Sequence, residues 1–554
     1  MRNKKCCYLL LVFIFYNILG IIGTYPLILH ITDSLPLNQI GNEVNSYSDT
    51  LQTYYGLWLF KYNLLGGVSP FQNNYEFSID SHQKFIGLDK FPLNLLFTLL
   101  SFFGDVFAYN SLVLLSFSLS GLGMYLLVEY LTKNKYSGII AGTLYAIAPF
   151  RVGETVIYGH IEGFMAFFLP FIIYFYERSF VEKDSRSMLW VGALILMVSF
   201  TGLHIMYYLL LFTLVYIPFK LLQSGGNIAS EFRKHLRALM ILSIFIILSI
   251  NYIMFQKSQN KNLDEFEGWS LSDIKKLSPH PIYFLLRDPM NIFYLGVVPL
   301  SVIATISLYF RKIPRNPEVW FYTLILSGGF ILALGPNFPS QSLSLYSLFY
   351  KFLPYFDHFR SPGRITIMIV LTLSVLLGFT IRKLCIIGNK ASKRSILIFM
   401  SIILLGIIAD CTIAPIKIGS LDENNKVYHM IKDGEGNQKL LEIPIVSSGW
   451  PGNSVYEYYI TIHKRGIING YAPFPPEGYN ELKEELKDLN SGKINKSQYL
   501  ILKEYDVGFV IVHENLLEYL YGNENITICI SNLIRSQYLD FIEKDNGVWL
   551  FKVN

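Results

Sequence analysis

Three groups of ionisable residues carry the chemistry that this sequence offers. The first is Asp49, which Gln52 follows three positions later. A carboxylate at a membrane face can take the proton of an acceptor hydroxyl or bind a metal ion. The same spacing fits a helix start with a capping box, in which Asp49 is the N-cap and Gln52 reaches back to it. The two roles are compatible, so the sequence leaves both open.

The second group is Arg151, Glu154, His160 and Glu162, in a short segment between two apolar runs. Glu and His are suitable ligands for a divalent cation such as Mg or Mn, which His160 and Glu162 would share with Asp49. Charged residues at helix ends also often just lie in the water layer. The group therefore predicts substrate binding, with a metal as an open alternative.

The third group is His358, Arg360 and Arg364, of which the two arginines bracket Pro362. Proline is favoured at the first position of a helix, and the free N–H groups of a helix start bind anions together with guanidinium groups. This pattern predicts an anion site. The alternative is that both arginines extend to water from the membrane interface.

The whole chain has the composition of a membrane protein. Of 554 residues, 52% are hydrophobic and 16% are charged, whereas ordinary soluble domains have about 25% charged residues. A disordered or fibrous chain and a single soluble domain are thereby excluded. The 46 Lys and Arg barely exceed the 41 Asp and Glu, so no nucleic-acid partner is indicated. We predict a multi-pass protein of the cell membrane.

Apolar runs near the length of one bilayer crossing supply the helices of this protein. The longest run, residues 188–219, exceeds a crossing of about 20 residues, and Thr201 and Gly202 favour a turn just before His204. His204 itself is interpreted as a satisfied buried histidine. With that run divided, eleven spans are predicted, within residues 6–29, 106–131, 136–150, 163–176, 188–219 (two spans), 238–255, 291–310, 319–334, 365–381 and 396–415.

The distribution of Lys and Arg predicts the orientation. With the N-terminus in the cytoplasm, the short inner loops collect most of the positive charge, as the positive-inside rule requires. Dividing the run 188–219 keeps the basic segment 233–237 on the inner side. Eleven crossings then place the C-terminal segment outside the cytoplasm.

Two regions lie outside the membrane in this topology. The first is the loop 30–105, and the second is the segment 416–554, where charged residues become frequent. The fold class is therefore an all-α polytopic membrane domain, residues 1–415, with a small extracytoplasmic α/β domain, residues 416–554. The elements expected in these regions are interfacial helices at 50–65 and 91–103, strands at 440–446, 507–513 and 548–553, and a helix at 479–489.

Motifs of several other protein classes are missing from the sequence. It contains no P-loop, dinucleotide fingerprint or nucleophile elbow. The five cysteines have no CxxC spacing, so neither a metal knuckle nor a disulfide framework is indicated. We find no inverted repeat of the kind that many transporters have.

The order of elements and several short motifs resemble the GT-C superfamily of integral-membrane glycosyltransferases. Asp49 lies in a stretch that looks like the acidic motif of the first GT-C loop, although it holds one Asp where many members have paired acids. Other motifs are similar to uncharacterised bacterial multi-pass proteins near the YfhO-like group. The stretches concerned are NSYSDTLQTYYGLW from Asn45, YAIAP from Tyr145, Gly159-His160, FRSPGR from Phe359, EIP from Glu442 and GIINGY from Gly466.

The resemblance implies an inverting glycosyltransferase that uses a sugar on a polyprenyl phosphate and an acceptor outside the cytoplasm, which is a saccharide, a lipid or a protein. It makes Asp49 the general base, and it makes Arg360 and Arg364 the groups that stabilise the departing phosphate. Because such a donor carries no nucleotide, the missing nucleotide motifs are consistent with it. We expect Asp49, His160 and Arg364 to line one cavity at the outer membrane face.

Two other classes of function remain open. A transporter or flippase of lipid-linked saccharides would place ionisable residues in the middle of the membrane, whereas here they gather at helix ends. A non-catalytic membrane scaffold for cell-envelope assembly would present the outer segment to a partner.

Overall fold

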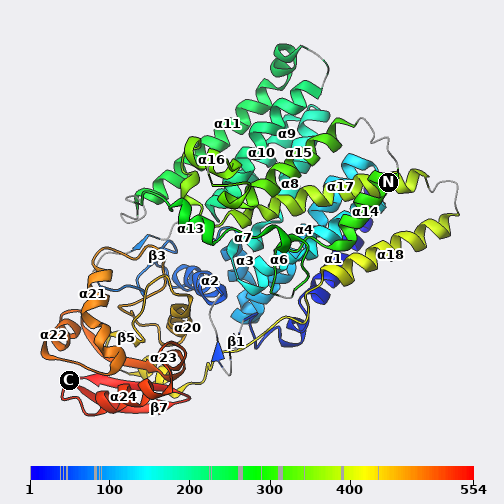
Figure 1. Cartoon of the computed structure of the whole chain (residues 1–554). Coiled ribbons are helices and arrows are strands. Elements are labelled where there is room, and N and C mark those ends of the chain that lie inside the picture. Colours follow the sequence, from blue (N-terminus) through cyan, green and yellow to red (C-terminus); the bar gives the residue numbers. More distant parts are fainter. Residues whose placement is uncertain are drawn as a thin grey trace. The chain divides into compact units, whose positions relative to one another are not determined.

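The structure is a computed structural model of the whole chain (Figure 1). It describes residues 2–37, 39–40, 43–44, 48–79, 84–85, 88, 90–223, 225, 227–259, 266–288, 290–309, 316–341, 343–387, 392–434 and 436–554. The chain forms two compact units. The first comprises residues 1–31, 110–254 and 267–416, and the second comprises residues 32–109, 255–266 and 417–554.

The first unit is built of helices, which occur at every position where the sequence predicts a span. Seven of the described helices are long and apolar enough to cross a membrane, and the others are shorter, so the count of eleven crossings stays a prediction. The helices are α1 (Arg2–Gly23), α4 (Asp105–Thr132), α5 (Lys135–Ile147), α6 (Pro149–Val152), α7 (Ile161–Met165), α8 (Phe168–Val181), α9 (Ser185–Ser199), α10 (Leu203–Gln223), α11 (Ile228–Ser258), α13 (Leu271–Lys276), α14 (Val297–Tyr309), α15 (Pro317–Ala333), α16 (Leu345–Phe352), α17 (Thr366–Ile387) and α18 (Lys393–Cys411).

Burial distinguishes the inner from the outer helices of this unit. The window that contains α17 is 89% buried, whereas that of α11 is 17% buried although it is more apolar. A helix that is apolar but unburied is suited to face lipid, and one that is apolar and buried forms the core. Helix α17 accordingly packs against α5, α14 and α15. The predicted division of residues 188–219 is confirmed, since α9 ends at Ser199 and α10 begins at Leu203.

Short single turns connect these helices. Among them, the π-helical turn η3 (Gly153–Ile157) follows α6, and the turn η7 (Pro362–Ile365) leads into α17 with Pro362 in its first turn. The remaining turns are η1 (Leu27–His30), η4 (Pro281–Phe284), η5 (Gly335–Asn337) and η6 (Phe356–His358).

The second unit joins the first loop to the C-terminal segment. The loop supplies α2 (Thr50–Leu65) and α3 (Leu93–Leu100), which match the two predicted interfacial helices. Most of α2 is buried because it packs against α3 and against a C-terminal helix. Helix α3 continues into η2 (Ser101–Phe103) and leaves Leu99 and Phe102 exposed, which suits contact with lipid headgroups. The loop also contains β1 (Gln39–Ile40), β2 (Glu43–Val44), β3 (Gln72–Asn73) and β4 (Lys84–Phe85).

A four-stranded mixed sheet forms the core of the C-terminal part (Figure 1). Its order is β5 (Lys439–Ile443), β6 (Val507–His513), β8 (Val548–Val553) and β7 (Leu539–Asp545), with β5 and β6 parallel and the other pairs antiparallel. Helices and single turns complete it: α19 (Lys426–Asp433), η9 (Pro451–Asn453), α20 (Ser454–His463), α21 (Tyr479–Leu486), η10 (Lys487–Ser491), α22 (Lys496–Glu504), α23 (Glu514–Tyr521) and α24 (Asn523–Ile534).

Three of the four strands were predicted from their apolar runs, and β7 was not. Strand β7 lies at the edge of the sheet and is mostly exposed, so its sequence is rich in charge. The missed signal is the dipeptide Asn546-Gly547 between β7 and β8. Both residues have positive φ, 42° and 76°, which a two-residue hairpin of this kind requires.

Candidate functional site

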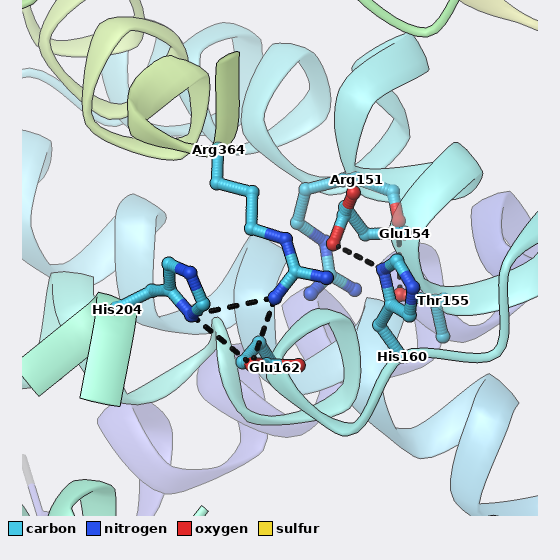
Figure 2. Close-up of polar contacts among 7 residues, drawn as sticks. All are labelled: Arg151, Glu154, Thr155, His160, Glu162, His204 and Arg364. Carbon is cyan, nitrogen blue, oxygen red and sulfur yellow. Dashed lines mark hydrogen bonds and ion pairs between the residues drawn. The ribbon is translucent and has the colours of Figure 1, made fainter. Parts of the chain in front are cut away.

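The first unit contains a buried polar cluster where α6, η3, α7, α10 and η7 meet (Figure 2). Gly163 allows these segments to approach, because a Cβ at this position would lie 2.7 Å from backbone atoms of Glu154 and Thr155. Gly159, with a φ of +66°, turns the chain between η3 and α7. The local sequence therefore places Glu154, His160 and Glu162 close together.

Arg151 holds this corner together. It is fully buried, and its Nη1 donates to the carbonyl of Gly163 at 2.6 Å, while Nη2 donates to Oγ of Ser116 at 3.3 Å. Its guanidinium also lies over the ring of Phe117 at 5.0 Å. Burial lowers the pKa of Arg151 to about 10, so it remains charged at neutral pH. Arg151 thus links α4, α6 and α7 as well as lining the cavity described below.

Glu154 and His160 form one ion pair of the cluster. His160 Nδ1 lies 2.9 Å from Oε2 of Glu154, and the backbone N–H of His160 donates to the Glu154 carbonyl at 2.8 Å. Burial acts to raise the pKa of Glu154, but the charge and hydrogen bond of His160 outweigh it and leave that pKa below its ordinary value. Glu154 is therefore ionised at neutral pH.

Arg364 lies at the centre of the second group of contacts. Its Nη1 donates to Oε1 of Glu162 at 3.3 Å and to Nδ1 of His204 at 3.3 Å. The same Nδ1 lies 3.7 Å from Oε1 of Glu162, so Arg364, Glu162 and His204 form one group of mutual contacts.

A small cavity of about 20 Å³ lies beside these groups. This volume holds about one water molecule. Six polar side chains belong to its wall, and apolar residues and glycine form the rest. They are Arg151, Glu154, Glu162, His204, Tyr208 and Arg364. The two arginines balance the charge of the two glutamates on this wall.

Three predicted residues of this unit, His160, His358 and Arg360, lie apart from the cavity walls that the structure describes. His358 Nδ1 bonds Oδ1 of Asp357 at 2.8 Å, and the exposed Arg360 lies over the ring of Trp269 at 5.4 Å. Of the two arginines that bracket Pro362, only Arg364 lines the cavity. His204, which the sequence suggested to be a satisfied core residue, lines it as well; its position beside the turn Thr201–Gly202 was the available signal.

Asp49 belongs to the second unit, at the N-terminus of α2. The predicted capping box is wrong, because the Asp49 side chain makes no capping hydrogen bond. Ser48 Oγ instead accepts from the N–H of Thr50 at 3.1 Å. Residues 45–47 of the first-loop motif lie outside the described residues.

Tyr471 holds the half-buried Asp49 in place. Its hydroxyl donates to Oδ1 of Asp49 at 2.7 Å, across 422 residues of sequence. Its backbone N–H donates to Oε1 of Glu76 at 3.1 Å, and its carbonyl accepts from Gln52 at 3.3 Å. Gly470 permits this approach, since a Cβ there would lie 2.8 Å from Phe77.

A second acid, Glu457, lies buried beside Glu76. Burial, and then the charge and hydrogen bond of Glu76, raise the pKa of Glu457 well above its ordinary value. Asn73 donates to the other Glu76 oxygen at 2.5 Å. Neither Tyr471 nor Glu76 was singled out for a role from the sequence, although Tyr471 ends the GIINGY motif.

The predicted metal ligands are engaged with other side chains. Asp49 accepts from Tyr471, His160 bonds Glu154, and Glu162 accepts from Arg364. Among the described residues, no group of three or more His, Cys, Asp or Glu is arranged to hold a metal ion. The divalent cation that the sequence left open therefore stays a prediction.

Comparisons with known proteins identify the fold. No protein-family model and no curated protein sequence matches this chain. Among solved structures, it is similar to the archaeal oligosaccharyltransferase AglB from Archaeoglobus fulgidus in complex with an inhibitory peptide and a dolichol-phosphate, at 12% identity and a TM-score of 0.53, over 99% of this chain and 74% of AglB. The chain therefore shares the fold of AglB, a GT-C glycosyltransferase.

A second GT-C structure extends this result. The arabinofuranosyltransferase AftD from Mycobacteria is 12% identical, with a TM-score of 0.62, over 99% of this chain and 40% of AftD. The GT-C resemblance inferred from short motifs is thus confirmed at the level of the fold. The relation to YfhO-like proteins stays a prediction.

Proposed function

We propose that this protein is an inverting GT-C glycosyltransferase that moves a sugar from a polyprenyl-phosphate donor to an acceptor hydroxyl outside the cytoplasm. The observation that carries the proposal is Asp49, a half-buried carboxylate fixed at 2.7 Å by the hydroxyl of Tyr471. A general base must be both accessible and oriented, and this arrangement meets both conditions. The dolichol-phosphate in the AglB structure supports the class of donor.

In the proposed reaction, the acceptor oxygen attacks the anomeric carbon while Asp49 takes its proton. The bond from that carbon to the phosphate oxygen breaks, and the polyprenyl phosphate leaves with the bonding electrons. Arg364 stabilises the charge that grows on this phosphate, because its guanidinium plane is fixed before the reaction by Glu162 and His204. Attack opposite to the leaving group inverts the configuration of the sugar.

The remaining polar groups are assigned to substrate binding. The hydroxyl groups of the donor sugar would be held by Arg151, Glu154, His160 and Glu162. The two glutamates offer hydrogen-bond acceptors, and the arginine and the histidine offer donors. Arg360 and His358 would meet the phosphate or the lipid headgroups at the interface.

We also propose a role for each of the two predicted domains and an orientation of the chain in the membrane. Residues 1–415 carry out transfer, with the N-terminus in the cytoplasm, and residues 416–554 lie outside it. A cysteine at Asn480, which is exposed on α21, should react with an impermeant maleimide on intact cells. Gly492 is unsuitable for this purpose, since its φ is +73° and a Cβ would lie 2.1 Å from the carbonyl of Cys529. Labelling that requires lysis would contradict the orientation.

The deciding experiment is transfer by the purified full chain in liposomes with defined polyprenyl-phosphate sugars and a panel of saccharide, lipid and protein acceptors. We expect a glycosylated product that the Asp49→Asn variant does not form. Movement of the lipid-linked sugar across the bilayer without a product would support a flippase instead. The predicted metal requirement is tested by measuring transfer after chelation with EDTA and again after addition of Mg or Mn. The reaction proposed above does not depend on a metal ion.

A further inference from the structure

A second cavity, of about 200 Å³, opens within the second unit. Five segments build it: the loop before α19, helix α20, the end of β6, the start of α23, and the hairpin turn between β7 and β8. None of its lining residues has a part in the reaction proposed above.

The innermost residue of this cavity is His513, the last residue of β6. It is 5% exposed, and its Nε2 lies 2.9 Å from Oε2 of the fully buried Glu442 and 3.2 Å from the hydroxyl of Tyr428. Burial raises the pKa of Glu442 despite the opposing effect of the hydrogen bond and charge of His513. With Nε2 engaged, Nδ1 is the ring nitrogen that has no bond to another described residue.

The walls of the cavity differ between floor and rim. Val455 and Tyr459 lie one helical turn apart on α20 and form an apolar floor together with Leu516. At the rim, Asn546 donates to Asp422 at 2.6 Å, which ties the hairpin turn to the loop before α19. An apolar floor below a polar rim matches a sugar ring, which has C–H faces and hydroxyl edges.

The charges of the cavity select against other ligands. Its described lining includes one carboxylate, Asp422, and no Lys or Arg, so a phosphate or another anion finds no counter-charge. One carboxylate is also too few for a calcium or magnesium ion, which needs six or more oxygen ligands. The half-exposed side chain of Asn515 offers a donor and an acceptor at the rim.

We propose that this cavity is a binding site for a neutral saccharide, which His513, Asn515 and Asp422 hold by its hydroxyl groups above a floor of Val455 and Tyr459. This site is separate from the transfer reaction, because no bond of the bound saccharide is formed or broken there. The site would keep a glycan chain attached to the protein.

Saturation-transfer difference NMR on the full chain in detergent tests this proposal, with a panel of neutral pentose and hexose disaccharides as probes. We expect signals from the ring C–H groups of at least one disaccharide. Asn515→Leu should weaken that binding about 10-fold, since it removes a hydrogen bond of the usual strength. Asn480→Leu, the same change at an exposed position of α21 away from the cavity, should leave binding unchanged.

Three results would overturn the proposal. They are the absence of a signal from every disaccharide, equal binding by the Asn515→Leu and Asn480→Leu variants, or preferential binding of inorganic phosphate that Asn515→Leu removes. A His513→Gln variant with an unchanged melting temperature provides a second test, and it should also bind at least several-fold more weakly. The binding measurement does not depend on transferase activity. A negative result would therefore contradict the saccharide site without contradicting the proposed transfer reaction.

Discussion

The polar cluster around Arg364 in the first unit and the acids around Asp49 in the second unit are stabilised in different ways. In the first cluster both glutamates have a basic partner: Glu154 bonds His160, and Glu162 accepts from Arg364. In the second unit Asp49 is held by a neutral hydroxyl, and Glu457 lies beside another acid, Glu76. Ion pairing keeps a buried charge in place, whereas pairing of acids favours retention of a proton. The first arrangement suits binding of a charged substrate, and the second suits proton transfer.

The largest effect is expected for Asp49→Asn. If the second unit supplies the base, transfer should fall by about 10²- to 10⁴-fold, because an amide cannot take the acceptor proton. The rate of product formation at saturating donor measures this. Asp540→Asn, on the exposed edge strand β7, loses the same charge and should transfer normally. Wild-type rates from Asp49→Asn would assign the base to another group.

The next effect is expected for Arg364→Gln, which tests the first unit. Losing one charge-assisted hydrogen bond to the phosphate, worth about 1.5–3 kcal/mol, should slow transfer roughly 10- to 100-fold. Arg364→Lys should rescue only in part, since an ammonium cannot bind two oxygens in a planar fork. Arg360→Gln removes the same charge outside the described cavity walls and should have a smaller effect. Equal effects of the two glutamine variants would contradict the distinction between these arginines.

A smaller effect is expected for Tyr471→Phe, which removes the hydroxyl that orients Asp49. Transfer should slow about 10-fold through kcat, with little change in the KM for the donor, because one hydrogen bond to a charged acceptor is lost. Tyr456→Phe is the matched control, since it removes a buried hydroxyl that donates to the carbonyl of Pro444 in the same unit. If both variants lose activity equally and melt earlier, Tyr471 has only a structural role.

The smallest effect concerns stability and pH. The pKa of Glu457 is raised in the folded protein, so folding favours its neutral form. In the unfolded chain the pKa of a glutamate is about 4.3. The free energy of unfolding therefore declines as the pH rises from about 4.3 toward the pKa of Glu457 in the folded protein. Glu457→Gln should therefore raise the melting temperature by a few degrees near neutral pH and by less near pH 5. Thermal unfolding in detergent at several pH values measures this difference. A variant that gains nothing at neutral pH would show that Glu457 is ionised in the fold.

The sequence by itself determined the membrane character, the positions of the helices and three of the four C-terminal strands. These features depend on local patterns of apolar residues, which can be read along the chain. It also identified Asp49, His160, Glu162 and Arg364 as candidates, because their types are unusual at the ends of apolar runs. The charged edge strand β7 lacked that pattern, and only its turn, Asn546-Gly547, marked it.

Only the tertiary structure decided which of these residues act together. The hydroxyl of Tyr471 meets Asp49 across 422 residues, and Arg364 meets Glu162 across 202 residues. Such pairs are fixed by the packing of whole helices and loops, and no local spacing records them. The same packing separated Arg364 from Arg360, four residues away, and placed His204 on a cavity wall. Residue types thus gave the available chemistry, and the fold selected the partners.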